Sequence, residues 1–287
     1  MAAPALASLD NALADAVKSV GPSVVHVARG HHQGGTGIVW AADLVITSNF
    51  HTPDRTKVGL PTDDGELDLR DAEVIGRDAG TDVAVLRVTG GGLTPATFRE
   101  LGTLSVGNLA LAIGRPGRSA RASLRAIGVL GPEVETPHGG TLDRYVESDR
   151  QIPRGFAGGP LVTTDGGVLG MNTRTLIRGA DIAVPTTTLN TVVAALVAHG
   201  GIRKGYLGVG AYPSKQGAII ASLEDDGPAA KAGVIVGDII TEVDGEAVSG
   251  PDSLRSVLAS RPDKAVKVVL VRGGARMELD VTIGNRS

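Results

Sequence analysis

The 287-residue chain lacks cysteine, so it can form neither a disulfide bond nor a thiolate metal site. Aromatic residues make up only 2% of it, and no apolar run is long enough to span a bilayer. The net charge of −3 gives no reason to expect nucleic acid or an anionic membrane as a partner. No phosphate loop, dinucleotide fingerprint or metal-ligand cluster is recognisable, and we therefore expect no cofactor and no metal site.

The sequence does not determine the cellular compartment of the protein. The first residues, Met1 to Pro4, lack the basic and apolar segments of an export signal. The chain is therefore either cytoplasmic or an exported, periplasmic protein whose signal has been removed. The length is sufficient for about two domains, and 41 glycines and 15 prolines fit many short strands joined by turns.

Three local patterns have ordinary structural interpretations. Leu6, Leu9, Leu13, Val17 and Val20 form an apolar stripe that predicts a helix packed on the body of a domain. The adjacent histidines at 31 and 32 have no carboxylate nearby and are interpreted as solvated loop. Four arginines between 115 and 125 are interpreted as a solvated hairpin: Arg115, Arg118, Arg121 and Arg125.

The most informative stretch is G-F-A-G-G-P-L-V, which begins at Gly155. Taken alone, Gly-Gly-Pro could be a generic turn. Other runs precede it in a fixed order: P-S-V-V from Pro22, G-T-G-I-V from Gly35, I-T from Ile46 and D-V-A-V-L from Asp82. Together these motifs resemble the HtrA/Deg family of trypsin-like serine proteases, and the resemblance covers nearly the whole chain. It implies a mainly β fold, a chymotrypsin-like double six-stranded β-barrel followed by a PDZ domain.

The resemblance implies catalytic positions but also two losses. The nucleophile position of the G-x-S-G-G-P loop is Ala157, whose methyl group cannot attack a carbonyl. The T-x-x-H pattern, anchored on Thr47, places the base at Phe50, which cannot transfer a proton. His51 is one residue late and would reach the site only through a local bulge. Asp82 takes the position of the aspartate that orients the histidine, with a turn-capping aspartate as the alternative.

Backbone groups of the loop survive a change of side chain. The resemblance assigns the oxyanion hole to the amides of Gly155 and Ala157, and these donors do not depend on the serine. The loop therefore combines retained carbonyl-binding geometry with a missing nucleophile.

The C-terminal part resembles a PDZ domain as HtrA proteins carry it. The string P-A-A-x-A-G, G-D-x-I and V-x-G follows a Gly-Tyr-Leu-Gly loop at 205–208. The resemblance implies that backbone amides of this loop hold a peptide carboxylate and that a helix from Asp252 to Ser260 lines the groove. The expected peptide-binding residues are Tyr206, Leu207, Gly208, Val209, Leu254 and Leu258. The expected boundaries are 1–21 for the helix, 22–199 for the barrels, 200–205 for the linker and 206–287 for the PDZ domain.

Three functions remain open on the sequence. The first is a natural pseudoprotease that binds unfolded or C-terminal peptide segments without cutting them. The second is a serine endopeptidase of protein quality control, inactivated by an engineered serine-to-alanine change at 157, with His51 as base. The third is a PDZ scaffold protein. A homo-oligomer is a further expectation, although no aromatic residue precedes Trp40 to support the trimer that such relatives form through their N-terminal segment.

Overall fold

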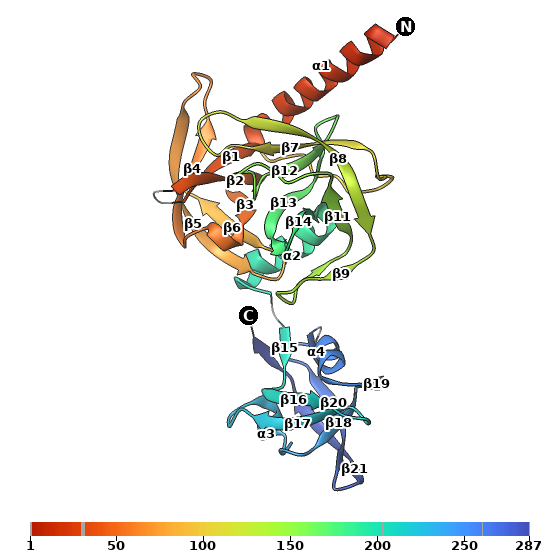
Figure 1. Cartoon of the computed structure of the whole chain (residues 1–287). Coiled ribbons are helices and arrows are strands. Elements are labelled where there is room, and N and C mark those ends of the chain that lie inside the picture. The colour runs from red at the N-terminus through yellow and green to blue at the C-terminus, as the bar shows by residue number, and fades with distance from the viewer. Residues whose placement is uncertain (1, 30–31, 203, 260, 287) are drawn as a thin grey trace. The chain divides into compact units, whose positions relative to one another are not determined.

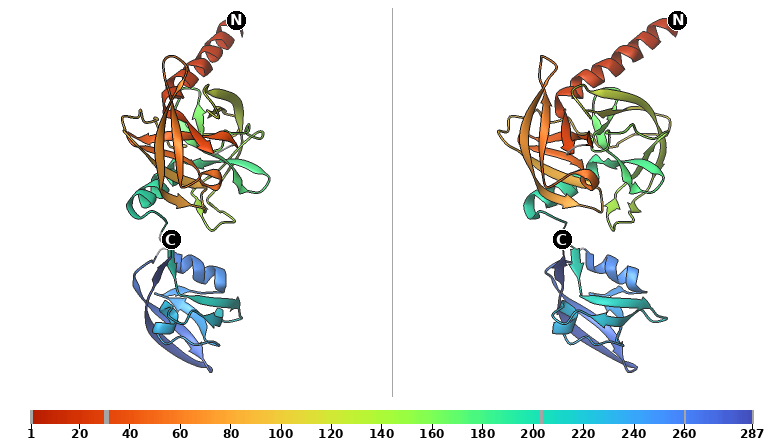
Figure 2. Two further views of the ribbon diagram at one scale, coloured as in Figure 1. Left: turned by 90° about the vertical axis from the view of Figure 1, so that its left-hand side faces the viewer. Right: turned by 60° about the vertical axis from the view of Figure 1, so that its left-hand side comes forward.

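The computed structural model describes residues 2–29, 32–202, 204–259 and 261–286. The chain divides into two compact units, Met1–Gly201 and Ile202–Ser287. Figure 1 shows the strands and helices of each unit, and Figure 2 gives two further views. In the part of the chain described, no helix combines the length and apolar character that crossing a membrane requires.

The first unit contains two closed antiparallel barrels. The first barrel has the strand order β1-β2-β3-β6-β5-β4. Its strands are β1 (Val24–Arg29), β2 (His32–Ala41), β3 (Leu44–Ser48), β4 (Arg55–Pro61), β5 (Leu67–Asp78) and β6 (Val83–Val88). A 3-10 turn, η1 (Gly21–Ser23), precedes β1, and a second, η2 (Asn49–His51), follows β3. Closure removes the unpaired edges that an open sheet would expose.

The second barrel has the order β11-β14-β13-β12-β7-β8. Its strands are β7 (Leu109–Gly114), β8 (Arg121–Gly131), β11 (Tyr145–Ser148), β12 (Pro160–Thr163), β13 (Val168–Ile177) and β14 (Ala180–Pro185). A small hairpin, β9 (Val134–Glu135) with β10 (Thr141–Leu142), leaves it between β8 and β11. The nucleophile-type loop therefore lies directly before β12, and Asp82 directly before β6.

Two helices flank the barrels. Helix α2 (Thr186–His199) buries Leu189, Val192 and Leu196, and Gly200 ends it with a φ of 73°. Helix α1 (Ala2–Val20) behaves differently from the prediction of a packed helix. Val20 is 3% exposed, but Leu6 is 67% exposed. The helix prediction is confirmed, whereas the expected packing is wrong for its first half, because periodicity shows an apolar face without showing what covers it.

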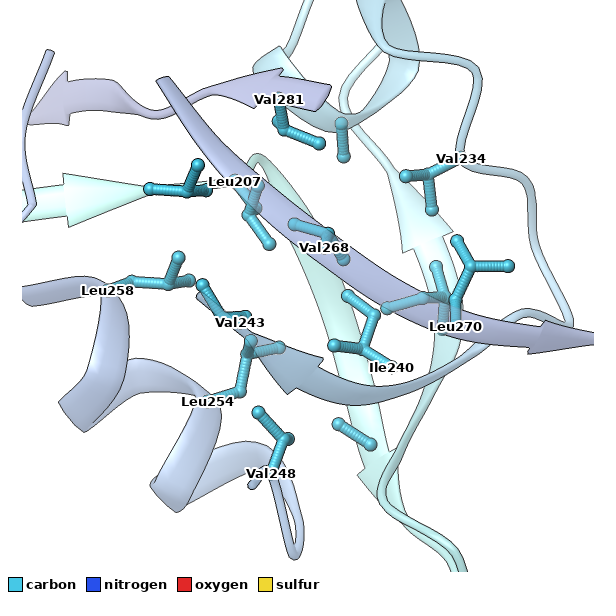
Figure 3. Close-up of a cluster of buried hydrophobic side chains, with 14 of the residues drawn as sticks. Leu207, Val234, Ile240, Val243, Val248, Leu254, Leu258, Val268, Leu270 and Val281 are labelled. Atoms are coloured by element: carbon cyan, nitrogen blue, oxygen red, sulfur yellow. The ribbon is translucent and has the colours of Figure 1, made fainter. Parts of the chain in front are cut away.

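The second unit is a separate α+β module. Its sheet has the order β16-β17-β18-β20-β21, and β19 pairs with β18. The strands are β15 (Lys204–Tyr206), β16 (Val209–Pro213), β17 (Ala218–Leu223), β18 (Ile239–Val243), β19 (Glu246–Ala247), β20 (Ala265–Arg272), β21 (Ala275–Thr282) and β22 (Gly284–Arg286); the helices are α3 (Pro228–Lys231) and α4 (Pro251–Ala259). Figure 3 shows how α4 places Leu254 and Leu258 against strand residues such as Val243 and Val268. Both barrels and this module agree with the predicted fold class, which is confirmed.

The interpretation of residues 115–125 as a solvated hairpin is wrong for two of the four arginines. Arg115 is 6% exposed and donates to the carbonyl oxygens of Val24, Arg118 and Gly21. Arg125 is 2% exposed and donates to the carbonyls of Arg150 and Gln151. A guanidinium can be buried when its fan of N–H groups meets backbone acceptors, and a count of charges along the sequence does not reveal this.

Candidate functional site

The loop before β12 is shaped by glycines that no other residue could replace without strain. Gly155 and Gly158 have φ angles of 83° and 87°, in the left-handed region that favours glycine. A Cβ on Gly158 would lie 2.3 Å from the carbonyl oxygen of Thr36 and 2.6 Å from the Thr47 hydroxyl. A Cβ on Gly155 would lie 2.5 Å from the Cβ of Pro116. The loop is therefore pressed against β2, β3 and the end of β7.

Side chains outside the loop hold its backbone in place. The Thr36 hydroxyl donates to the carbonyl oxygen of Gly155 at 2.6 Å and accepts from the amide of Arg115 at 2.8 Å. Phe156 is 2% exposed and packs where Gly114 leaves room for its ring. Within the described residues, neither the Gly155 amide nor the Ala157 amide donates to another protein group. The two amides assigned to an oxyanion hole thus have no internal acceptor.

Asp82 lies at the end of the β5–β6 connection and is completely buried. Its φ of 58° is left-handed, a conformation that aspartate tolerates better than most residues. Four groups donate hydrogen bonds to its carboxylate. They are the Ser48 hydroxyl (3.0 and 2.8 Å to the two oxygens), the Phe50 amide (3.0 Å), the Thr173 hydroxyl (2.5 Å) and the Thr175 hydroxyl (3.2 Å).

These contacts join the two barrels at Asp82. Ser48 and Phe50 belong to the β3 end of the first barrel, and Thr173 and Thr175 to β13 of the second. Burial raises the pKa of Asp82, and the hydrogen bonds from Thr173, Phe50, Ser48 and Thr175 oppose this shift. Both oxygens of the carboxylate thus accept hydrogen bonds, from hydroxyl groups and a backbone amide.

The position next to Asp82 is occupied by Phe50, which is half-buried in η2. The Phe50 ring lies beside that of His138, at 5.1 Å between ring centroids and with an interplanar angle of 56°. His138 belongs to the turn between β9 and β10, which is held to the first barrel by the Thr136 hydroxyl donating to the Gly80 carbonyl at 2.7 Å. The side chain of His51, the alternative base, lies outside the described residues, as do His31 and the side chain of His32.

The positions that the resemblance assigns to nucleophile and base hold an alanine and a phenylalanine. Ala157 is 9% exposed and belongs to a small apolar cluster with Ala112, Ile152 and Phe156. A methyl group and a phenyl ring can neither attack a carbonyl nor accept a proton. Two backbone N–H groups can still donate to a carbonyl oxygen.

Sequence reasoning missed several residues of this site. Ser48, Thr173 and Thr175 were not singled out, although alternation along β13 places both threonines on one face. The alternation shows that the two threonines share a face of the strand, but it does not show that this face contacts Asp82. Thr36 was also missed, since a threonine within a glycine-rich strand gives no signal of its distant partner at Gly155.

A second site lies in the C-terminal unit, where a groove of about 540 Å³ runs between β16 and α4. It is lined by residues of the loop before β16, of β16 and of α4, with Glu224 beside the loop. The lining residues are Gly205, Tyr206, Leu207, Gly208, Val209, Gly210, Ala211, Glu224, Pro251, Leu254, Arg255 and Leu258. All six residues predicted to bind peptide therefore lie around one groove.

The groove has the elements that strand addition requires. Among the described strands, β16 pairs with β17 alone, so its other edge is unpaired, and residues of β16 line the groove. Gly208 has a φ of 72° and turns the chain just before β16. Leu207, Leu254 and Leu258 are 2%, 3% and 4% exposed and form an apolar floor continuous with the core. An extended peptide can pair with such an edge while its apolar side chain contacts the floor.

One motif residue of this module has a structural role. Asp238, from the G-D-x-I string, is completely buried and accepts two hydrogen bonds from Arg272 at 2.8 Å each and one from the Ile235 amide at 2.9 Å. Burial opposes its ionisation, but the Arg272 guanidinium and the Ile235 amide outweigh burial, and the pKa of Asp238 is lowered.

Comparison with known proteins agrees with both units. Residues 35–171 match the family model described as a trypsin-like peptidase domain, and residues 205–283 match that of a PDZ domain. The chain is 32% identical over 272 residues to a probable periplasmic serine endoprotease DegP-like of Brucella suis, covering 87% of this chain and 52% of that protein. The chain belongs to the HtrA/Deg family.

Other members of the family give the same result. A second relative is the periplasmic pH-dependent serine endoprotease DegQ of Escherichia coli. The two sequences are 30% identical over 274 residues, which cover 87% of this chain and 59% of DegQ. The chain thus spans about half to three fifths of the length of these two curated relatives. A serine endoprotease from Yersinia pestis matches with a TM-score of 0.76 at 26% identity, covering 96% of this chain and 98% of that one. The HtrA-type protease AlgW with tripeptide matches with a TM-score of 0.70 at 26% identity, covering 96% and 97%.

Proposed function

We propose that this HtrA/Deg chain is a pseudoprotease, which binds unfolded or C-terminal peptide segments and does not cleave them. The observation that carries the proposal is the identity of the residues at the nucleophile and base positions. The resemblance assigns the nucleophile position to Ala157 and the base position to Phe50, and the backbone amide of Phe50 donates to the Asp82 carboxylate. Loss of nucleophile and base costs roughly a million-fold in rate in triad enzymes.

The proposal keeps two binding surfaces. The first is the loop at Gly155, where the backbone amides of Gly155 and Ala157 would donate hydrogen bonds to a peptide carbonyl oxygen. The second is the groove between β16 and α4, where amides of Leu207, Gly208 and Val209 would hold a terminal carboxylate. The similarity to AlgW with tripeptide supports peptide binding in a chain of this fold. The curated relatives are periplasmic, which favours the exported alternative for the compartment.

Peptide binding is tested by fluorescence anisotropy with the full chain and a fluorescein-labelled decapeptide that ends in valine. We expect a micromolar Kd, which corresponds to about 8 kcal/mol. Amidation of the peptide's C-terminus is expected to weaken binding at least tenfold, because the carboxylate loses its amide donors. Equal binding of the free and amidated peptides would contradict the proposal for the groove.

A substitution in the groove tests whether the peptide binds there. Ala211 lies on β16 and lines the groove, so Ala211→Trp should fill the space and abolish binding. An unchanged melting temperature would show that the variant still folds. Unaltered binding by a folded Ala211→Trp chain would place the peptide elsewhere.

A further inference from the structure

Two charged residues line the groove between β16 and α4, one beside its loop and one on its helix. Among the described residues that line the groove, Glu224 and Arg255 are the two that carry charge. The Oε2 atom of Glu224 lies 3.2 Å from the point where a Cβ on Gly208 would stand, next to the expected carboxylate position. Arg255 lies on α4, on the same helix face as Pro251, Leu254 and Leu258.

Strand geometry fixes which ligand residue each group meets. A peptide that pairs antiparallel with β16, its last residue opposite Val209, places its third-last residue opposite Ala211. Val209 and Ala211 pack toward the core that α4 covers, so the last and third-last side chains both point toward α4. These two side chains are about 7 Å apart along a strand.

The spacing along α4 matches this separation. Leu258 lies next to Gly205, because a Cβ there would be 2.1 Å from the Leu258 carbonyl oxygen. Leu258 and, from the loop, Leu207 therefore lie nearest to the last ligand residue. Arg255 lies one turn further along, about 4.5 Å by helical rise, and its long side chain spans the remaining distance.

Arg255 is available for a ligand. A guanidinium nitrogen of Arg255 lies 3.1 Å from a carboxylate oxygen of Asp252. The two side chains are 78% and 96% exposed, respectively. An ion pair this exposed contributes little and exchanges readily.

We propose that the groove selects C-terminal segments with an apolar last residue and an acidic third-last residue, and that Arg255 reads this acidic side chain. The inference rests on the proposed peptide binding. The ligand class is thus an acidic protein C-terminus that ends in an apolar residue.

The test uses the full chain and three fluorescein-labelled decapeptides that end in valine and differ only at the third-last residue, which is Glu, Gln or Lys. We expect the Glu peptide to bind roughly threefold more tightly than the Gln peptide and the Lys peptide to bind most weakly, as for an exposed ion pair. The preference should shrink between 20 mM and 500 mM salt, because exposed charges are screened. Arg255→Glu should reverse the order.

Two further variants act as controls. Asp252→Asn removes the competing carboxylate and should increase the preference for the Glu peptide. Arg276→Glu reverses a charge on β21, at the opposite edge of the sheet, and should leave the order unchanged. Equal affinities for the three peptides, with amidation still abolishing binding, would overturn the inference and leave the proposed function standing. Failure of all peptides to bind would overturn both.

Discussion

The backbone amide of Phe50 donates to the buried Asp82 carboxylate at 3.0 Å, so the residue at the assigned base position contacts the acid through its main chain. In a working triad the base is oriented by this carboxylate through its side chain. Here the contact is made by the main chain alone, and the hydroxyls of Ser48, Thr173 and Thr175 supply the other donors. We infer that Asp82 now serves to join the barrels.

Asp82→Ala should destabilise the first unit by about 3 kcal/mol, because buried donors left without an acceptor cost about 1–3 kcal/mol each and partial relaxation offsets part of the sum. Asp82→Asn should also destabilise it, since an amide NH2 would face other donors. Urea unfolding followed by fluorescence of Trp40, the single tryptophan, reports on this unit.

Asp54→Asn is the matched control for the Asp82 variants. The Asp54 side chain is 92% exposed in its ion pair with Arg77, so the change should leave the unfolding midpoint almost unaltered. A midpoint for Asp82→Ala equal to that of the parent chain would contradict the joining role of Asp82.

The glycine at 158 can be tested against a glycine of the same backbone conformation. Gly158 and Gly179 have φ angles of 87° and 86°, but only Gly158 is tightly enclosed, and a Cβ on Gly179 would meet nothing within 4 Å. Gly179→Ala should cost about 1 kcal/mol from its left-handed conformation. Gly158→Ala should cost at least about 2 kcal/mol more, because backbone atoms must move.

Thermal unfolding followed by Trp40 fluorescence compares the two alanine variants directly. Equal melting temperatures would mean that the loop can relax away from β2 and β3. The proposal that the Gly155 and Ala157 amides bind a carbonyl would then lose its support.

Asp238→Asn should weaken the C-terminal unit by about 2 kcal/mol, in the range of a lost hydrogen bond to a charged group. Because the pKa of Asp238 is lowered in the folded chain, the ionised carboxylate stabilises the fold above its ordinary value of about 3.9. This contribution is lost as the pH falls through the lowered pKa.

Hydrogen exchange of residues 234–243 measures this effect. The parent chain should lose protection as the pH falls below about 4, after correction for intrinsic exchange rates, and Asp238→Asn should show low protection throughout. Parallel pH profiles of the two chains would contradict the role of Asp238.

The sequence predicted the fold because its information was local. The ordered motifs from Pro22 to Gly155 resemble those of the HtrA/Deg family, and this resemblance gave the barrel assignment. The P-A-A-x-A-G string gave the PDZ assignment in the same way. Partners distant in sequence were not predictable. Thr36 meets Gly155 across 119 positions, and Thr173 meets Asp82 across 91.

The burial of individual arginines was not predictable from the sequence either. Arg115 and Arg118 look alike in sequence, yet Arg115 is buried and Arg118 is exposed. The difference arises because only Arg115 lies at the end of β7, where the carbonyls of Gly21 and Val24 converge on it. Which polar side chains a barrel buries depends on closure, which local patterns do not specify.

The most direct test is hydrolysis of unfolded casein by Ala157→Ser, measured beside the parent chain and the double variant Ala157→Ser with Phe50→His. With Phe50 at the base position, we expect no detectable cleavage by the single variant, and measurable cleavage only when a histidine is placed at 50. The comparison should be made with variants whose melting temperatures match that of the parent chain. Robust cleavage by Ala157→Ser alone would show that His51 serves as base, and the chain would then be an enzyme that lacks only its serine.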